Sequence, residues 1–176
     1  MEMNYTTLIT GTILIVLFSW FYSIRQKRYH GIPRFFSFES IFILVVLNIK
    51  IWFHDPFSFL QICSWIFLIL SAYFGIAGVV LLTSKGKSGT NFEETTVLVK
   101  SGIYQYIRHP LYFSLFLLGT GVMLKNPGFL QIILGFINLA AVFITSRVEE
   151  KEMIKKFGNS YREYMRETKM FIPWIL

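Results

Sequence analysis

Long apolar runs alternate with short polar segments along the chain. The apolar runs lie near Tyr5–Ile24, Phe38–Phe53, Phe57–Leu82, Leu111–Leu124 and Gly128–Ser146. A helix needs roughly 20 apolar residues to cross a bilayer, and fewer where neighbouring helices shield it. The pattern therefore predicts about five transmembrane helices, the last two forming a shorter pair.

Two of the polar segments are too short for anything except a tight turn between helices. They are His54-Asp55-Pro56 and Lys125-Asn126-Pro127. Connections of this length join antiparallel neighbours, and proline closes each turn because it cannot continue the helical hydrogen bonding. We therefore expect spans two and three, and spans four and five, to form helical hairpins.

The longer polar segments are a loop over residues 83–110 and a tail over residues 147–176. Membrane proteins retain lysine and arginine on the cytoplasmic side, and 15 of the 17 basic residues fall on one side of the predicted spans. These are Arg25, Lys27, Arg28, Arg34, Lys85, Lys87, Lys100, Arg108, Arg147, Lys151, Lys155, Lys156, Arg162, Arg166 and Lys169. Lys50 and Lys125 lie toward the other side. This distribution predicts an N-terminus outside and a C-terminus in the cytoplasm.

Composition and charge agree with a membrane protein. The chain is 54% hydrophobic and carries a net charge of +7, and its mean hydropathy is +0.54. The basic residues lie in blocks between apolar runs, as beside anionic headgroups, so no nucleic-acid partner is expected. The predicted fold class is all-α: a polytopic membrane helical bundle of about five transmembrane helices with a cytoplasmic C-terminal helical tail.

The loop ends in a run of polar and aromatic residues that leads directly into the fourth span. It contains Tyr104, Tyr106, Arg108 and His109, followed by Pro110. Tyrosine and arginine often anchor a helix at the headgroups, and for Tyr106 and Arg108 this interpretation weighs equally with a functional one. His109 is the stronger candidate for chemistry, because it stands just before a helix-initiating proline at the membrane surface.

The fifth span leads into two adjacent carboxylates, Glu149 and Glu150. Carboxylates at the end of an apolar helix are costly unless a cation or hydrogen-bond donor meets them. Successive helical residues point about 100° apart, so the two are not expected to share one partner. For Glu152, one turn before Lys156, we expect a solvent-exposed i,i+4 ion pair with that lysine.

Together these segments resemble the isoprenylcysteine carboxyl methyltransferase and phospholipid methyltransferase group of membrane enzymes. The resemblance is carried by Leu98-Val99, Gly102, Tyr104, Arg108-His109-Pro110 and Tyr112, then Glu149-Glu150, then Phe157-Gly158, Tyr161 and Tyr164. It extends over roughly residues 95–173, so we divide the chain into N-terminal spans (residues 1–82) and a methyltransferase-like part (residues 83–176). The ordered set is specific, although each piece alone is weak.

The resemblance implies a site for S-adenosylmethionine, built by the loop, the start of span four and the glutamate after span five. The cofactor contacts it implies are Thr96, Val97, Leu98, Val99, Tyr104, His109, Pro110, Leu111, Tyr112 and Glu149. A carboxylate and tyrosine faces suit the sulfonium and ammonium cations of this cofactor. No metal is expected, because His30, His54 and His109 lie on different elements.

The substrate is less well defined than the cofactor. In the isoprenylcysteine enzymes, an arginine four residues before the cofactor glutamate holds the substrate carboxylate, but here that position is Thr145, with Arg147 nearby. Ser114 also replaces a glycine that is usual in the family. A prenylcysteine carboxylate and the amine or hydroxyl of another lipid are therefore equal alternatives. The candidate catalytic residues are Glu149, Glu150, His109 and Arg147.

The sequence thus predicts a methyltransferase acting on a lipophilic substrate from the bilayer, in a prokaryotic inner membrane. One alternative is an NADPH-dependent reductase resembling the steroid reductases, although no basic residues stand out for the 2′-phosphate. Another is a non-catalytic membrane scaffold whose Tyr, Arg and Glu side chains are interfacial anchors.

Overall fold

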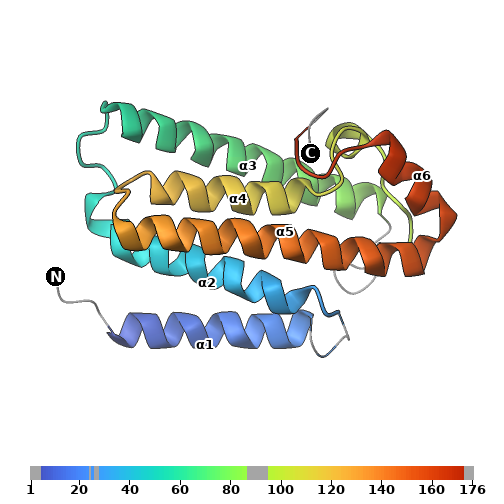
Figure 1. Ribbon diagram of the computed structural model, residues 1–176, viewed down its shortest axis with the longest axis horizontal. Helices are drawn as coiled ribbons and strands as arrows, with labels where there is room; N and C mark the ends of the chain where they lie inside the picture. The colour runs from blue at the N-terminus through green and yellow to red at the C-terminus, as the bar shows by residue number, and fades with distance from the viewer. Residues whose placement is uncertain (1–4, 24, 26–27, 87–94, 173–176) are drawn as a thin grey trace.

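A computed structural model describes residues 5–23, 25, 28–86 and 95–172 of the protein (Figure 1). In these described residues the chain forms six α-helices and no β-strand, which confirms the all-α prediction. They are α1 (Tyr5–Tyr22), α2 (Gly31–Asn48), α3 (Phe59–Lys85), α4 (Pro110–Met123), α5 (Phe129–Phe157) and α6 (Asn159–Glu167). The predicted positions Ile24, Lys27, Lys87 and Pro173 lie outside the described residues.

Among the described residues, four helical segments are long and apolar enough to span a membrane. They are Tyr5–Tyr22, Gly31–Ile51, Phe59–Lys85 and Phe129–Phe157. The fourth predicted span, α4, has only 14 residues, and at 1.5 Å per residue it is about 21 Å long. Because α4 packs against α2, α3 and α5, it is shielded from lipid by longer neighbours. The polytopic membrane bundle is confirmed, with one helix shorter than a bilayer.

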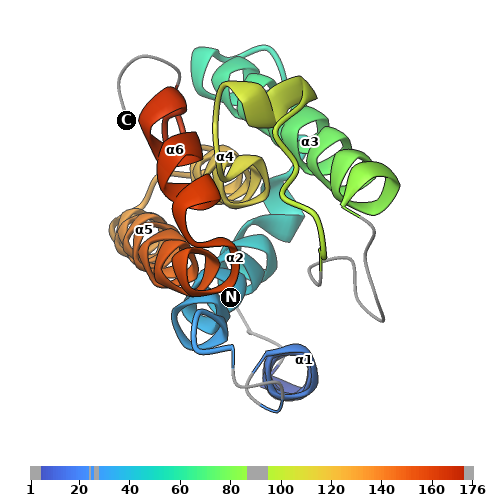
Figure 2. The same ribbon diagram turned by 90° about the vertical axis from the view of Figure 1, so that its right-hand side faces the viewer.

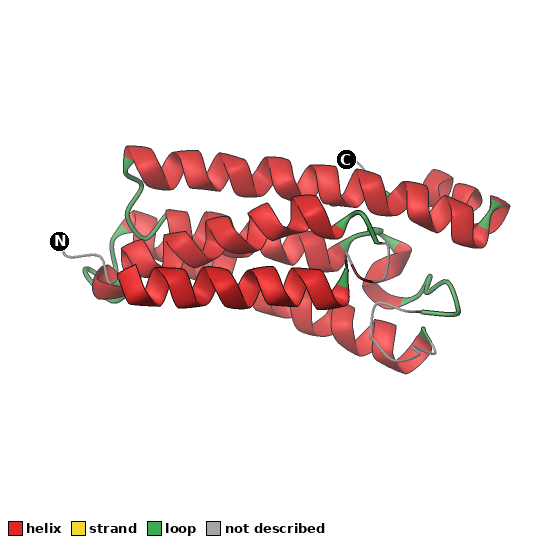
Figure 3. Cartoon of the chain, turned by 90° about the horizontal axis from the view of Figure 1, so that it is seen from below, coloured by secondary structure: helices red, strands yellow, loops and turns green. Residues whose placement is uncertain are grey.

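Figure 2, viewed along the bundle, shows α4 between α3 and α5, and α1 on the outside next to α2. Figure 3 shows the same helices side by side from below. The connections gather at two ends. The tail end is the end that contains residues 95–109, the last turns of α5, and the whole of α6 (Figure 1). The opposite end, with residues 49–58 and 124–128, is the hairpin end. The described parts of the two predicted polar segments therefore lie at one end, as the charge distribution indicated.

Two helices extend further than the apolar runs predicted. α2 begins at Gly31 instead of Phe38, and α5 continues to Phe157 instead of ending at Ser146. The added turns carry charged side chains that face other elements, so apolar runs alone underestimate the helices. As a result, Arg34 and Glu149 both lie on bundle helices and not in connecting segments.

Small residues permit close helix contacts in the interior. A Cβ at Gly119 would lie 2.1 Å from Asn138 Nδ2, so only glycine fits beside that side chain. The Ser64 hydroxyl donates to the carbonyl of Gly121 (2.6 Å), and Asn138 donates to the carbonyl of Leu115 (3.1 Å). Buried hydrogen bonds of this kind connect α3 and α5 to α4, which fixes the position of α4 and of the residues just before it.

The segment after α6 returns alongside the residues that precede α4. The backbone N–H of Arg108 donates to the carbonyl of Lys169 (2.8 Å), and that of His109 donates to the carbonyl of Met170 (3.2 Å). Lys169 donates in turn to the carbonyl of Tyr106 (3.1 Å). This short ladder ties the tail to the loop and positions Arg108 and His109.

Candidate active site

His109 is the residue around which the tail end is organised. It precedes Pro110, the first residue of α4, and has a non-helical backbone conformation (φ −124°, ψ 58°), as residues before proline favour. Its side chain is 5% exposed, and its ring stacks on Tyr112 with centroids 5.6 Å apart. The ring therefore lies inside the bundle and not at a solvated interface.

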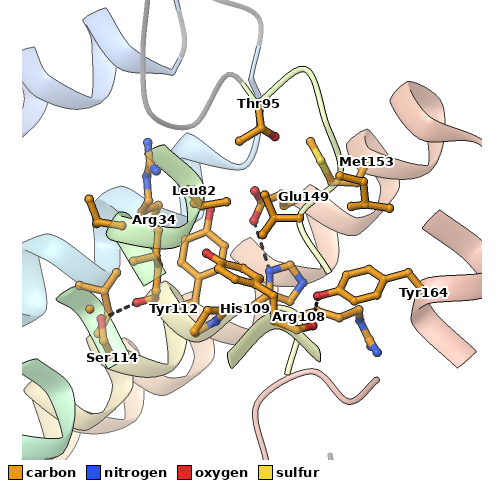
Figure 4. A pocket seen from close by; sticks show the side chains of 18 of the residues that line it. Arg34, Leu82, Thr95, Arg108, His109, Tyr112, Ser114, Glu149, Met153 and Tyr164 are labelled. Carbon is orange, nitrogen blue, oxygen red and sulfur yellow. Dashed lines mark hydrogen bonds and ion pairs between the residues drawn. The ribbon is translucent and has the colours of Figure 1, made fainter. Parts of the chain in front are cut away.

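Both carboxylates of α5 contact the His109 ring. Nδ1 lies 3.3 Å from Glu149 Oε2 (Figure 4), and Nε2 lies 3.6 Å from Glu150 Oε1. Burial alone would lower the pKa of His109, but its interactions with Glu149 and Glu150 outweigh this and raise the pKa above 6.5. The expectation that the carboxylates share no partner was wrong, because the two ring nitrogens point to different sides.

Arg108 and Glu150 form a buried ion pair that holds the tail in place. Arg108 Nε and Nη2 each lie 2.9 Å from Glu150 Oε1. Nη1 donates to the carbonyl of Met165 (3.2 Å) and to that of Thr168. Arg108 therefore connects α5 to the end of α6, while Tyr106, the other proposed anchor, is 53% exposed. Of the two, only Tyr106 fits the interfacial interpretation.

A cavity of about 330 Å³ lies beside this cluster (Figure 4). This volume is in the range of small-molecule sites. Its wall combines apolar side chains, such as Leu98 and Leu111, with the polar groups of Glu149, His109 and Arg34. The lining is drawn from α2, α3, the loop, α4, α5 and α6. An apolar cavity with a few convergent polar groups is the usual form of a ligand site.

Besides Tyr112, three further tyrosines line the cavity. Tyr104 precedes α4, and Tyr161 and Tyr164 lie on α6. Tyr164 donates from its hydroxyl to the carbonyl of Tyr104 (2.6 Å). Burial raises the pKa of all three phenols, and nearby Glu149 adds to this for Tyr104 and Tyr161. They therefore remain neutral and offer aromatic faces that attract cations.

Most of the predicted cofactor contacts lie together on the cavity wall. These are Leu98, Val99, Tyr104, His109, Pro110, Leu111, Tyr112 and Glu149. Thr96 and Val97 do not line it: both are exposed, and their backbone N–H groups donate to the carbonyl of Gly86. Their predicted contact with the cofactor is therefore not supported by the shape of the cavity.

The four candidate catalytic residues separate into three environments. Glu149 and His109 line the cavity, whereas Glu150 lies behind them, paired with Arg108. Arg147 is not part of the lining, and its side chain is 58% exposed, 3.4 Å from Glu150 Oε2. Arg147 does not reach the cavity because its side chain leaves α5 on another face.

Glu152, Thr145 and Ser114 each form contacts within the bundle. Glu152 does not form the predicted solvated pair with Lys156. Its carboxylate accepts from the backbone N–H of His30 (3.3 Å) and lies 2.6 Å from His30 Nδ1, because α5 packs along α2. Thr145 is fully buried and donates its hydroxyl to the carbonyl of Ala141 (2.6 Å). Ser114 lines the cavity and donates to the carbonyl of Leu111 (2.7 Å).

Sequence reasoning missed several residues of the wall. Tyr161 and Tyr164 belong to the recognised motif, so their spacing was available as a signal. Arg34 and Phe38 carried no signal beyond hydropathy and charge, and they come from the part predicted as simple spans (residues 1–82). The cavity draws on both predicted parts of the chain, whose division remains a prediction. In the described part of the chain, no group of three metal-ligating side chains is found.

Comparisons with known proteins agree with the motif. Residues 65–155 match the model of the isoprenylcysteine carboxyl methyltransferase (ICMT) family. A protein-S-isoprenylcysteine O-methyltransferase of Dictyostelium discoideum is 34% identical over 120 residues, covering 63% of this chain and 49% of the relative. The corresponding protein of Saccharomyces cerevisiae is 40% identical over 90 residues, covering 49% and 36%.

A methanethiol S-methyltransferase of Crocosphaera subtropica is 28% identical over 160 residues, covering 78% of this chain and 59% of the relative. The chain thus spans about half or less of the isoprenylcysteine enzymes that it matches. No solved structure matches it significantly. The phospholipid methyltransferase side of the resemblance stays a prediction. Because the family model covers more than half of the sequence, including the loop, α4 and Glu149, the chain belongs to the isoprenylcysteine carboxyl methyltransferase family.

Proposed function

We propose that this protein is a membrane methyltransferase that uses S-adenosylmethionine to methylate a lipophilic acceptor from the bilayer. The observation that carries the proposal is the position of Glu149, whose carboxylate lines a mostly apolar cavity beside His109. Membership of a methyltransferase family supports the activity. The chemistry of the cavity wall supports the choice of methyl donor.

The wall of the cavity fits the donor. A carboxylate and tyrosine faces complement a sulfonium and an ammonium group, and here they are Glu149, Tyr104 and Tyr161. The apolar side chains of Leu98 and Val99 suit an adenine ring. When bound, the donor would supply a methyl group on a positively charged sulfur. The acceptor would form a bond to the methyl carbon in line with the carbon–sulfur bond, which would break with its electron pair going to sulfur.

The residues of the site would bind, orient and exclude water. Glu149 holds a cationic ligand, and His109 fixes the Glu149 carboxylate from the side of α4. Met153, Phe157 and the buried tyrosines close the wall toward α6. Positioning of two reactants and a dry site account for most of the rate enhancement in such a displacement.

The electrostatics of His109 favour an acceptor that is already anionic. An amine or hydroxyl has to lose a proton, and the interactions that raise the pKa of His109 stabilise its protonated form, which cannot accept one. A carboxylate needs no proton removal. We therefore place an isoprenylcysteine-like carboxylate first, with the amine or hydroxyl of a lipid as the alternative.

The proposal includes an orientation in the membrane. With the N-terminus outside and the C-terminus inside, the tail end faces the cytoplasm, where the donor is made, and the acceptor arrives laterally from the bilayer. A prokaryotic inner membrane is the proposed location. Single-cysteine labelling at the tail end from either side of sealed vesicles tests the orientation, and labelling from outside would contradict it.

Ligand stabilisation tests the function. A ligand at 100 times its dissociation constant stabilises the folded state by about 2.7 kcal/mol. The detergent-purified protein should melt at a higher temperature with S-adenosylmethionine or S-adenosylhomocysteine, and at an unchanged temperature with NADPH. With methyl-labelled donor and a lipid extract, label should appear in a lipophilic product. Stabilisation by NADPH alone would overturn the proposal in favour of a reductase.

A further inference from the structure

Arg34 is a buried cation on the cavity wall. It lies in the first turn of α2, is 4% exposed and lines the cavity together with Phe38, one turn further along the same helix. Figure 4 shows Arg34 projecting from α2, whereas Glu149 projects from α5. The two opposite charges therefore reach one cavity from neighbouring helices.

The fold supports Arg34 by specific contacts. Its Nη2 donates to Ser23 Oγ (2.7 Å), and its guanidinium carbon lies 5.7 Å from the centre of the Phe38 ring. Ser23 is able to approach because Gly31 has no side chain: a Cβ there would lie 2.1 Å from Ser23 Cβ. The adjacent His30 is bound to Glu152 of α5. The start of α2 is thus fixed, and Arg34 with it.

The charges around the cavity favour an anion near Arg34. Of the described lining residues, Arg34, Arg108 and His109 are able to carry positive charge, and Glu149 alone is a carboxylate. Glu150, just behind the wall, offsets Arg108, and Glu149 contacts His109. Among the described lining residues, cationic side chains therefore outnumber carboxylates, and a cationic donor binding to Glu149 would increase this excess. Because a guanidinium carries five N–H donors, Arg34 is able to receive an anion in addition to the contacts it makes within the chain.

Arginine is the residue type best suited to this task. Its planar guanidinium offers five N–H donors in a fork that matches the two oxygens of a carboxylate. The lining beside it continues in apolar residues, Phe38 on α2 and Gly75, Val79 and Leu82 on α3. A ligand with an anionic head and an apolar body would complement these groups.

We propose that Arg34 is the anion-binding residue of this site and selects ligands that carry a carboxylate. This inference rests on the proposed function and deepens it. Thr145 does not serve this purpose, because its hydroxyl is engaged with its own helix. The carboxylate belongs either to the amino-acid part of the methyl donor or to the acceptor, and the experiment distinguishes these two sources.

The experiment compares ligand pairs that differ only in the carboxylate. The donor pair is S-adenosylmethionine and decarboxylated S-adenosylmethionine. The acceptor pair is N-acetyl-S-farnesylcysteine and its carboxamide. Dissociation constants are measured in detergent for the wild type, Arg34→Gln and Arg162→Gln, whose arginine is exposed on α6. A charge-assisted hydrogen-bonded pair contributes enough to make the wild type prefer the carboxylate about 10- to 100-fold in one pair.

Arg34→Gln should lose that preference while binding the carboxylate-free partner as well as the wild type does, and Arg162→Gln should keep it. Loss in the donor pair assigns the anion to the donor, and loss in the acceptor pair assigns it to the acceptor. If the wild type prefers the carboxylate in neither pair, or if Arg34→Gln keeps the wild-type preference, the proposed role of Arg34 is wrong. The proposed function is not affected by that result. The first comparison needs no variant, so the inference stays testable if Arg34→Gln does not fold. If the wild type binds neither donor, the proposed function fails, and the role of Arg34 with it.

Discussion

At the hairpin end of the bundle, Lys125 is buried among groups of its own chain, whereas at the tail end the buried cations border a cavity. Lys125 is 5% exposed, and its Nζ donates to Gln61 Oε1 (2.9 Å). Nζ also lies 3.7 Å and 5.3 Å from the ring centres of Trp65 and Trp52. At the tail end, His109 lies between two carboxylates, one of which faces the cavity.

The difference shows what separates a structural cation from a candidate site. Around Lys125, neutral and aromatic groups of the chain surround the ammonium and tie the hairpin of α4 and α5 to α3. Around His109, charged groups meet at the edge of a space of about 330 Å³, where a ligand is able to exchange with an internal partner. Both ends contain a buried cation, but only the tail-end cation borders a cavity of this kind in the described residues.

The largest expected effect at the tail end comes from the buried ion pair. Replacing Glu150 with glutamine leaves Arg108 buried without its carboxylate, which should destabilise the protein by roughly 3–5 kcal/mol. Thermal unfolding in detergent measures the effect, and Glu163→Gln, at an exposed position of α6, is the matched control. Equal melting temperatures for the two variants would show that the pair does not hold the tail.

At the hairpin end, Lys125→Met should separate stability from function. Loss of the cation–π contacts and of the hydrogen bond to Gln61 should cost about 1–3 kcal/mol, because the methionine still fills the space. Donor affinity should stay at the wild-type value, since the tail end is unchanged. A drop in donor affinity comparable with the loss of stability would mean that the two ends are coupled.

The pH dependence of the protein's stability should reveal the interactions of His109 with Glu149 and Glu150 at the tail end. The pKa of His109 is raised in the folded protein above 6.5, so its contribution is fully present below pH 6.5 and is lost as the pH rises through the folded-state pKa. Melting temperatures of the wild type should therefore fall relative to those of His109→Gln as the pH rises through this window. A difference that grows with pH would contradict the assignment.

The smallest effect is expected for Arg147, which contacts Glu150 from the exposed side of α5. Exposed ion pairs contribute about 0–1 kcal/mol, so Arg147→Gln should hardly change the melting temperature or the donor affinity. A tenfold loss of donor affinity in a titration would contradict this prediction and show that Arg147 contributes to donor binding.

Hydropathy predicted the helices well where side chains face lipid or an apolar interior. It failed at the tail-end turns of α2 and α5, because Arg34 and Glu149 are charged residues that fold into the bundle. A sequence window cannot show that Ser23 will contact Arg34, or that His30 will contact Glu152. The lengths of these helices therefore depend on partners that are distant in sequence.

The sequence predicted those parts of the site whose residues are close together along the chain or belong to the family motif. Tyr104, His109 and Tyr112 are close in sequence, and the family motif adds Glu149 from α5. The pairing of Arg108 with Glu150 and the position of Arg34 follow from how α2, α4 and α5 pack, which no motif encodes. Thr96 and Val97 share the motif region but leave the wall where the backbone turns toward Gly86.

The central claim is that Glu149 binds a cationic methyl donor in the tail-end cavity. Calorimetric titration of S-adenosylmethionine into the wild type, Glu149→Gln and Glu163→Gln tests it most directly. Because a charged partner contributes about 1.5–3 kcal/mol to such a contact, Glu149→Gln should bind roughly 10- to 100-fold more weakly, while Glu163→Gln should match the wild type. Wild-type affinity in a folded Glu149→Gln protein would contradict the account.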